Sequence, residues 1–387
     1  MEFSVKPLYA HRLNALPPYP FAELQRKAAE KRAHGEDVID LGIGDPDLPP
    51  PAFFVEALQR HAADPDVHLY SSSQGNIEVR QAIAHFFKGR FGVELDPDTQ
   101  ICVVIGAKEG LSSLGRVYVN PGEEVGVPSP AYPVYGAGVA TLCNGHVRTI
   151  ALREEDGFLP RLREAEGVRM LFVNYPNNPT GAIAPEAFWP ELADFCDTHP
   201  ETVVVHDHAY SEMTFGGYRA PSLLQFTPNA VEMHSISKVF NATGFRVGYA
   251  AGREDFMAGL AKCKSQIDSG APLMIQRTMA DALGRYRGAT PPPEVEEMRK
   301  IYGERRALAE AALEKMGVRV THSPATFYVW AHVGTDEMPF VEEALQKNVI
   351  VTPGRGFGQL GLGFIRLALT QPVDRIREAL ERLAAIQ

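Results

Sequence analysis

Cysteine is scarce in this sequence, and a long apolar run is missing altogether. The cysteines lie far apart and form no C-x-x-C pair, so neither a disulfide framework nor a zinc knuckle is expected. They are Cys102, Cys143, Cys196 and Cys263. No apolar stretch approaches the ~20 residues that a membrane-spanning helix needs, and the N-terminus lacks the pattern of a secretory signal. We therefore expect a protein of the reducing cytoplasm that does not enter a membrane.

Basic charge is also in short supply. The chain has 48 acidic and 38 basic side chains, for a net charge of -10, and no basic stripe that could follow a phosphate backbone. A nucleic-acid partner is therefore not expected. Hydrophobic residues, in contrast, make up 45% of the 387 residues. This length and composition suit one large and one smaller domain around a sizeable core.

From about Ile39, short β-branched runs alternate with longer amphipathic stretches. This alternation is typical of an α/β fold with a mainly parallel sheet. The expected strands are 101–105, 170–175, 202–205 and 231–234, and the expected helices are 77–91, 111–119 and 185–197.

A Pro- and Gly-rich break at 288–293 indicates a domain connection. After it, the pattern predicts a smaller α+β domain with helices 294–316 and 339–347, a closing helix, and strands 318–322, 326–331, 349–352 and 363–369. We expect an N-terminal arm over 1–44 that contributes to the small domain, a large domain over 45–287 and a small domain over 288–387.

Three chemically active residues each follow an expected parallel strand: Asn178, Asp207 and Lys238. Ligands of open α/β sheets bind at the carboxyl ends of the strands. The sequence therefore predicts that an amide, a carboxylate and an amine meet in one pocket.

Lys238 lies close in sequence to side chains that could bind a phosphate. Burial beside Arg246 would lower the pKa of the amine and favour its attack on an aldehyde. The hydroxyls of Ser235 and Ser237, with the Arg246 guanidinium, would supply donors for a phosphate close to the amine. A surface lysine after a strand is the alternative, and the lysine taken alone favours it.

Asp207 follows three valines, and a buried carboxylate needs a cationic partner such as a protonated pyridine nitrogen. A salt bridge or a helix N-cap is the alternative. His206 and His208 flank it, but no third ligand cluster accompanies them, so no metal is expected. Tyr210 could donate to a phenolate oxygen of a cofactor or could be a half-buried packing residue.

Three weaker signals each have an ordinary structural explanation. Asn178 lies in the turn-rich segment 174–181 and could bond a cofactor ring, or this segment is a plain β-to-α loop. The backbone N–H groups of 106–110 could bind phosphate, or this glycine loop only joins a strand to a helix. Tyr132 could stack on a flat ring or fill the core.

Arg366 is a single charge in an apolar strand. Its guanidinium suits a planar anion such as a substrate carboxylate, and an internal ion pair is equally compatible with the local sequence. The segment 356–361 matches G-x-G-x-x-G, but a strand is expected after it where a dinucleotide site needs a helix. A nicotinamide site is therefore not expected.

Taken together, the strings YPNNPTG, HDHAYSE, SISK followed by TGFRVG, and GFIRLALT resemble the class I/II aminotransferases of the fold-type I pyridoxal-phosphate group. Further strings over almost the whole chain, among them LPPYPFA, LGIGDPDLP and ATFYVWA, most resemble bacterial LL-diaminopimelate aminotransferases. The resemblance implies a large domain with a mainly parallel seven-stranded sheet and a smaller α+β domain.

The resemblance implies pyridoxal 5′-phosphate as the cofactor. Lys238 would bond to its aldehyde and move the substrate proton, and Asp207 would keep its ring nitrogen protonated. Tyr210 and Asn178 would bond the ring oxygen, while Tyr132 would stack on the ring. The residues that would hold the phosphate are Ala107, Lys108, Ser235, Ser237 and Arg246.

The resemblance also implies substrate contacts. Arg366 would bind the α-carboxylate, with Gly44 and Asn178 nearby. Tyr19 and Lys108 could reach the distal end of the substrate. Tyr70 would come from the neighbouring subunit, so a homodimer is implied.

Four single positions, and the stretch 71–75 after Tyr70, depart from the family pattern, and we expect them to touch the rim of the pocket and the surroundings of the cofactor. Ala107 stands where a serine is usual, and Phe245 where a tryptophan is usual. Phe240 replaces a tyrosine and His208 replaces an alanine.

The implied activity is a ping-pong transamination, a step of lysine biosynthesis, between LL-diaminopimelate and 2-oxoglutarate. Aspartate or another amino acid is the alternative donor. A β-lyase reaction on the same cofactor is a less favoured alternative.

Overall fold

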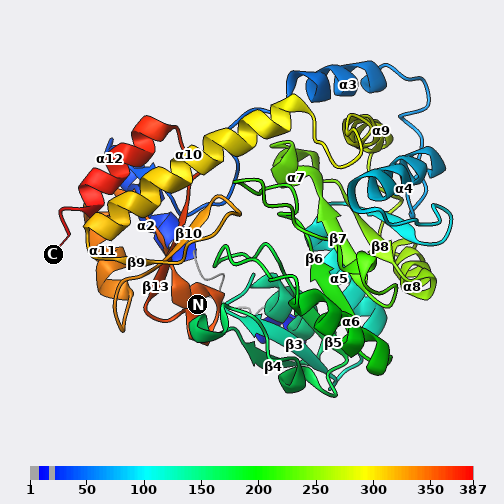
Figure 1. Ribbon diagram of the computed structural model, residues 1–387, viewed down its shortest axis with the longest axis horizontal. Coiled ribbons are helices and arrows are strands. Elements are labelled where there is room, and N and C mark those ends of the chain that lie inside the picture. The colour runs from blue at the N-terminus through cyan, green and yellow to red at the C-terminus, as the bar shows by residue number, and fades with distance from the viewer. Residues whose placement is uncertain (1–7, 17–21, 387) are drawn as a thin grey trace, which may run out of the picture.

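The computed structural model describes residues 8–16 and 22–386, and its centre is a seven-stranded sheet (Figure 1). The strand order is β2-β8-β7-β6-β5-β3-β4. β8 runs antiparallel to β2 and β7, whereas the other neighbouring pairs are parallel. The strands are β2 (Ile101–Val104), β3 (Glu124–Ser129), β4 (His146–Ala151), β5 (Met170–Val173), β6 (Val203–Asp207), β7 (Val231–Ser235) and β8 (Gly248–Gly252). The prediction of an α/β fold with a mainly parallel seven-stranded sheet is confirmed.

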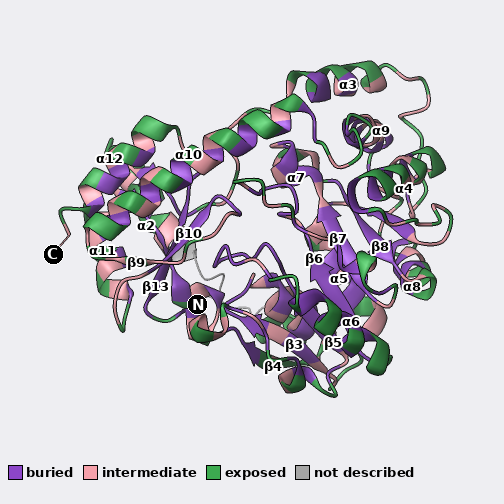
Figure 2. Cartoon of the chain, in the orientation of Figure 1, coloured by how far each residue is buried: buried purple, intermediate pink, exposed green. Residues whose placement is uncertain are grey.

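Helices cover both faces of this sheet, which explains why its strands are apolar on both sides (Figure 2). Alternate side chains of β2 point to opposite faces of the sheet and contact different helix layers. Val103 packs with residues of α4 and α9, whereas Cys102 and Val104 pack with residues of α5 and α8. The covering helices include α3 (Ala52–Ala62), α4 (Ile77–Phe91), α5 (Ala107–Tyr118), α6 (Phe188–Thr198), α8 (Glu254–Lys264) and α9 (Leu273–Leu283).

Helix α4 illustrates how the sequence specifies an element. Val79, Ile83, Phe86 and Phe87 are buried, and their spacing of three to four residues places them on one face. The helix ends before Gly92, which has the left-handed φ of 70° that favours glycine after a helix. Both ends agree with the range expected from the sequence.

The second, smaller sheet is antiparallel, with strand order β12-β13-β10-β9. Its strands are β9 (Arg319–Val320), β10 (Tyr328–His332), β12 (Thr352–Pro353) and β13 (Phe364–Ala368). Beside it lie the long helix α10 (Pro293–Lys315) and the helices α2 (Ala22–Ala33), α11 (Met338–Gln346) and α12 (Val373–Leu383) (Figure 1). The domain boundaries expected from the sequence stay a prediction.

A parallel pair, β1 (Ile39–Asp40) with β11 (Val349–Ile350), ties the N-terminal segment to the C-terminal part of the chain. The tie continues beyond the strands. The Leu41 carbonyl accepts from the Ala368 N–H at 2.6 Å, and the Gly42 carbonyl accepts from the Thr352 hydroxyl at 2.9 Å. Residues 41–44 are thereby held beside the larger sheet's strand ends.

Some expected boundaries are wrong. Helix α5 starts at Ala107 and not at residue 111, because Gly106, with a φ of 78°, lets the chain turn directly from strand to helix. Helix α6 starts at Phe188, after a turn that contains Pro185. The expected strand 349–352 is split, since β11 pairs with β1 while β12 pairs with β13. Within the described ranges, no helix has the length and apolar character required to cross a bilayer.

Candidate active site

A cavity of about 430 Å³ lies where β5, β6 and β7 end, and we call it the site cavity. It brings together most of the residues that the sequence analysis singled out. These lining residues are Gly44, Ala107, Lys108, Tyr132, Asn178, Asp207, Tyr210, Ser235, Ser237, Lys238, Arg246 and Arg366.

Lys238 enters the site cavity from α7 (Ile236–Val239), the short helix that follows β7. Its half-buried amine donates to the Gly44 carbonyl at 2.6 Å. Loss of solvent lowers the pKa of the amine to about 8, with Asp45 opposing the shift and Arg366 and Arg246 adding to it. At pH 7 about a tenth of the amine is therefore unprotonated and able to attack a carbonyl carbon, far more than for an ordinary lysine.

Asp207 ends β6 and is buried. Tyr135 donates its hydroxyl to one carboxylate oxygen at 2.7 Å, and the Ala209 N–H donates to the other at 3.2 Å. Burial raises the pKa of Asp207, because no cation of the described chain forms an ion pair with it. A protonated ring nitrogen in the site cavity would supply the missing positive charge, so the carboxylate fits such a cofactor.

Arg366 lies on β13 and is buried, yet no carboxylate of the described residues pairs with it. Its terminal nitrogens donate to Asn178 Oδ1 at 2.9 Å and to the Gly42 carbonyl at 2.7 Å. Its Nε is buried without a hydrogen-bond partner. The internal ion pair considered for Arg366 is therefore not formed within the described ranges, and the guanidinium can accept an anionic ligand.

Four groups at one end of the site cavity can hold a phosphate. Helix α5 points its N-terminus there, and its first residue is Ala107. Ser235 and Ser237 line the same end, and the Ser235 hydroxyl accepts from the Ser237 N–H at 3.1 Å. Arg246 is exposed toward it, and a Cβ on Gly106 would lie 2.5 Å from a guanidinium nitrogen of Arg246. Any side chain at residue 106 would therefore displace the Arg246 guanidinium.

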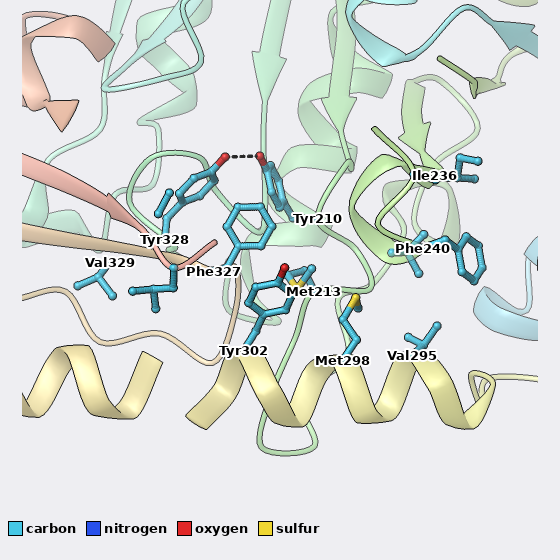
Figure 3. Close-up of a cluster of buried hydrophobic side chains, with 14 of the residues drawn as sticks. Tyr210, Met213, Ile236, Phe240, Val295, Met298, Tyr302, Phe327, Tyr328 and Val329 are labelled. Atoms are coloured by element: carbon cyan, nitrogen blue, oxygen red, sulfur yellow. Dashed lines mark hydrogen bonds between the residues drawn. The ribbon is translucent and has the colours of Figure 1, made fainter. Parts of the chain in front are cut away.

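Tyr210 lies beside the Asp207 end of the site cavity. Its hydroxyl forms a 2.9 Å hydrogen bond with the Tyr328 hydroxyl (Figure 3). Burial raises the pKa of Tyr210 well above its usual range, so the phenol stays protonated and can donate. Tyr132 is half-buried and meets Tyr135 edge-on, with 5.8 Å between the ring centroids.

Three residues of the site were missed by reasoning from the sequence: Tyr135, Asn174 and Tyr328. Asn174 donates to the Asp207 carbonyl at 2.7 Å and accepts from the Asn178 N–H at 2.8 Å, which fixes the loop that carries Asn178. Tyr328 lies inside the string ATFYVWA and Asn174 directly precedes YPNNPTG, but nothing in these strings shows which residue faces the cavity.

Two expected site residues are not among the described residues that line the site cavity. Tyr70 is 91% exposed and does not line it. Tyr19 lies outside the described residues. The role of both stays a prediction.

Three of the four family departures lie away from the site cavity, contrary to expectation. Phe240 is buried, with its ring 6.0 Å from those of Phe53 and Phe54, and Phe245 packs 5.2 Å from Phe54. Phe240 and His208 are buried, Phe245 is half-buried against the core, and of the four only Ala107 touches the cavity.

The expectation that His206 and His208 lack a third possible metal ligand is wrong. Glu232 lies opposite His206 in the register of β6 and β7, and one possible ligand atom from each of the three residues lies within 4.8 Å of the others. This group occupies the face of the sheet opposite Asp207, because side chains alternate along a strand.

Hydrogen bonds already occupy His206 and Glu232 of this group, whereas both ring nitrogens of His208 are buried without a hydrogen-bond partner. Glu232 is bonded to His206 at 2.9 Å and to His234 at 3.0 Å, and it accepts from Ser222 and from a backbone N–H. The rings of His206 and His208 stack 4.4 Å apart, so their in-plane lone pairs do not point at one centre. The absence of a metal stays a prediction.

The segment that matches G-x-G-x-x-G forms short turns and leads into β13, as expected. It therefore lacks the following helix that a dinucleotide site requires.

The family model described as "Aminotransferase class I and II" matches residues 36–383. The chain belongs to the class I and II aminotransferase family. Its enzymes depend on pyridoxal 5′-phosphate, so this aminotransferase takes the same cofactor. The groups described above fit that molecule, with a carboxylate for the ring nitrogen, an amine for the aldehyde and donors for the phosphate.

Proteins similar in sequence or in structure match this aminotransferase over almost its whole length. The LL-diaminopimelate aminotransferase of Halothermothrix orenii is 42% identical over 97% of each chain, and that of Syntrophobacter fumaroxidans is 43% identical over 97% of each. Among solved structures, a single mutant of Thermus thermophilus aspartate aminotransferase superposes with a TM-score of 0.91 at 29% identity, covering 98% of this chain and 99% of that one.

Proposed function

We propose that this aminotransferase moves an amino group between LL-diaminopimelate and 2-oxoglutarate by a ping-pong mechanism, as a step of lysine biosynthesis. The names of its full-length relatives at 42% and 43% identity support this donor. The observation that carries the reaction type is one cavity in which three groups lack a compensating charge among the described residues. They are an amine of lowered pKa, a carboxylate without a cation and a guanidinium without an anion.

When bound, pyridoxal phosphate supplies an electron sink for the bond to the substrate α-carbon. The chain's own residues provide the rest. With the cofactor bound, Lys238 Nζ would be the group that takes and returns the proton of the substrate α-carbon. Asp207, oriented by Tyr135, would be the carboxylate that stabilises a protonated ring nitrogen. Burial raises the pKa of Asp207, and a positive charge beside the carboxylate would offset this cost.

Arg366 binds the α-carboxylate of each substrate in turn. Its position is fixed by Asn178 and by the Gly42 carbonyl, so both substrates present the α-carbon at the same place relative to Lys238. In this proposal Tyr210 and Asn178 would bond the ring oxygen and Tyr132 would stack on the ring. Lys108, exposed at the edge of the cavity, would reach the distal end of the donor, and the same role for Tyr19 stays a prediction.

An amino-donor panel with 2-oxoglutarate tests the substrate. We expect glutamate to form fastest with LL-diaminopimelate and far more slowly with aspartate, the main alternative. A missing response to LL-diaminopimelate, with turnover of aspartate, would refute the donor and keep the aminotransferase. Pyruvate released from a cysteine thioether without any oxo acid would indicate the β-lyase alternative.

We further propose a homodimer in which Tyr70 of each subunit completes the other subunit's site. In the single chain Tyr70 is 91% exposed and Leu69 is 61% exposed, which suits coverage by another subunit. Mixing inactive Lys238→Ala and Tyr70→Phe chains tests this arrangement, since one site of each mixed dimer carries both native residues. Regained activity supports it, and none after verified exchange of subunits refutes it.

A cytoplasmic location is part of the same proposal. All four cysteines are free thiols, two of them buried, as suits a reducing compartment. Fractionation of the cells that make the protein would test it.

A further inference from the structure

Tyr328, on β10, lies between two parts of the site that the proposed mechanism treats separately. Its buried ring supports Arg366, whose guanidinium carbon is 4.1 Å from the ring centroid. Its hydroxyl oxygen is 2.9 Å from that of Tyr210 (Figure 3). One side chain therefore contacts both the carboxylate-binding residue and the phenol expected to bond the cofactor.

The hydrogen bond between the two phenols has only one useful direction. Each phenol carries a single proton. If Tyr210 gave its proton to Tyr328, none would remain for the oxygen of the cofactor ring. The 2.9 Å geometry allows either phenol to donate. If Tyr210 donates to the cofactor oxygen, it must accept from Tyr328, and Tyr328 is then the donor of this bond.

Tyr328 also packs against Gly44, whose carbonyl holds the Lys238 amine. A side chain at Gly44 would collide with the Tyr328 hydroxyl. The hydroxyl is thus held in place by the backbone on one side and by Tyr210 on the other, which leaves it little freedom to turn away.

We propose that Tyr328 is a positioning residue that directs the Tyr210 proton toward the cofactor oxygen and supports the Arg366 guanidinium with its ring. The first half rests on the proposed role of Tyr210. The second half needs only the observed contact of the ring with Arg366.

Tyr328→Phe tests the first half, because it removes the hydroxyl and keeps the ring. The readout is the pH at which the visible absorbance of the bound cofactor changes. An oxygen that loses hydrogen-bond donation holds its proton more tightly, so we expect this midpoint to rise by about half to one pH unit. Tyr210→Phe should raise it further, by about one to two units.

The double variant Tyr210→Phe/Tyr328→Phe decides whether Tyr328 acts through Tyr210. We expect it to have the same midpoint as Tyr210→Phe alone, because the hydroxyl of Tyr328 then has no proton to direct. An unchanged midpoint in Tyr328→Phe, or the same shift with and without Tyr210, overturns the first half. A merely structural role would not produce this dependence.

Comparing Tyr328→Leu with Tyr328→Phe tests the second half. Loss of the aromatic face should weaken binding of maleate, a non-reacting dicarboxylate, about fivefold to tenfold, whereas the phenylalanine variant should bind it as the wild type does. Equal maleate affinity in both variants overturns this half. If the leucine variant does not fold, a weakened maleate affinity in Tyr328→Phe would by itself contradict the assignment to the ring.

The wild-type protein separates this inference from the proposed function. A wild type that gains no visible absorbance with pyridoxal phosphate would refute the proposed site. A normal wild type with an inert Tyr328→Phe variant would refute only the role of Tyr328.

Discussion

Two buried carboxylates on neighbouring strands behave in opposite ways. Asp207 on β6 faces the site cavity and has two neutral donors, and burial raises its pKa. Glu232 on β7 faces the other side of the sheet. Although burial opposes it, hydrogen bonds with His206 and His234 hold the pKa of Glu232 well below its usual range.

Two lysines repeat the contrast. Lys238 in the site cavity donates to one carbonyl, and its pKa is lowered to about 8. Lys264 is buried and donates to Asp268 at 2.7 Å and to Glu109 at 3.0 Å. Although burial opposes it, these carboxylates raise the pKa of Lys264.

The difference teaches where to look for function in this protein. Burying a charge is costly unless a partner compensates it. Glu232 and Lys264 have that partner inside the protein and serve the fold. Asp207 and Lys238 have no such partner among residues 8–16 and 22–386, which fits the proposal that a ligand compensates them.

The largest expected effect is on Lys238→Ala. Activity should fall about 10⁴-fold, since the variant loses both the group that attaches the cofactor and the group that moves the proton. Lys264→Met is the matched control, because it removes an amine from another protected site. It should retain the turnover of the folded enzyme while it unfolds more easily. Steady-state kinetics on both variants check this, and wild-type turnover in Lys238→Ala would reject the proposed mechanism.

Next in size is Asp207→Asn. The amide keeps the shape but cannot hold a proton on the ring nitrogen, so kcat should fall about 10³-fold. Its stability without cofactor should not fall, because the variant removes a buried charge that has no cation. Turnover and urea unfolding of the cofactor-free protein measure the two effects. A stable variant with nearly normal kcat would contradict the role of Asp207.

Glu232→Gln should have the opposite pair of effects, with a loss of stability and an unchanged kcat. It leaves buried histidines without their carboxylate, so the free energy of unfolding should fall by about 3 kcal/mol. The folded fraction should keep its kcat, since Glu232 does not line the site cavity. Because the pKa of Glu232 is lowered in the fold, its stabilisation is present above pH ~4.3 and is lost on acidification. The difference in unfolding free energy between wild type and variant should therefore stay constant from pH 5 to 8 and shrink below pH ~4.3, which urea unfolding at a series of pH values measures.

The smallest effect concerns the pH dependence of cofactor capture. With a pKa of about 8, Lys238 is mostly protonated at pH 7 and mostly free at pH 9. The rate at which the cofactor-free protein bonds pyridoxal phosphate should rise about tenfold over this range and then level off. The reaction of pyridoxal phosphate with Nα-acetyl-lysine, whose side-chain amine has an ordinary pKa, should continue to accelerate up to pH 10. Stopped-flow absorbance compares them, and a protein rate that follows the free amino acid would contradict the lowered pKa.

Much of the site could be predicted because its residues lie at strand ends in strings of fixed order. Asn178, Asp207 and Lys238 were placed in one pocket on this ground alone, and they line one cavity. The sequence pattern predicts neither β3 nor β8, because glycine and proline weaken the β-strand signal. β3 contains Gly126 and Pro128, and β8 contains Gly248 and Gly252.

The order of residues along the chain by itself determined which groups stand where β5, β6 and β7 end, because strand ends follow from local hydrophobic patterns. Only the tertiary structure decided which charges find a partner. Tyr135 meets Asp207 across 72 positions, and Tyr328 meets Tyr210 across 118. Such contacts depend on how the two sheets and their helices pack together, and no local pattern encodes them.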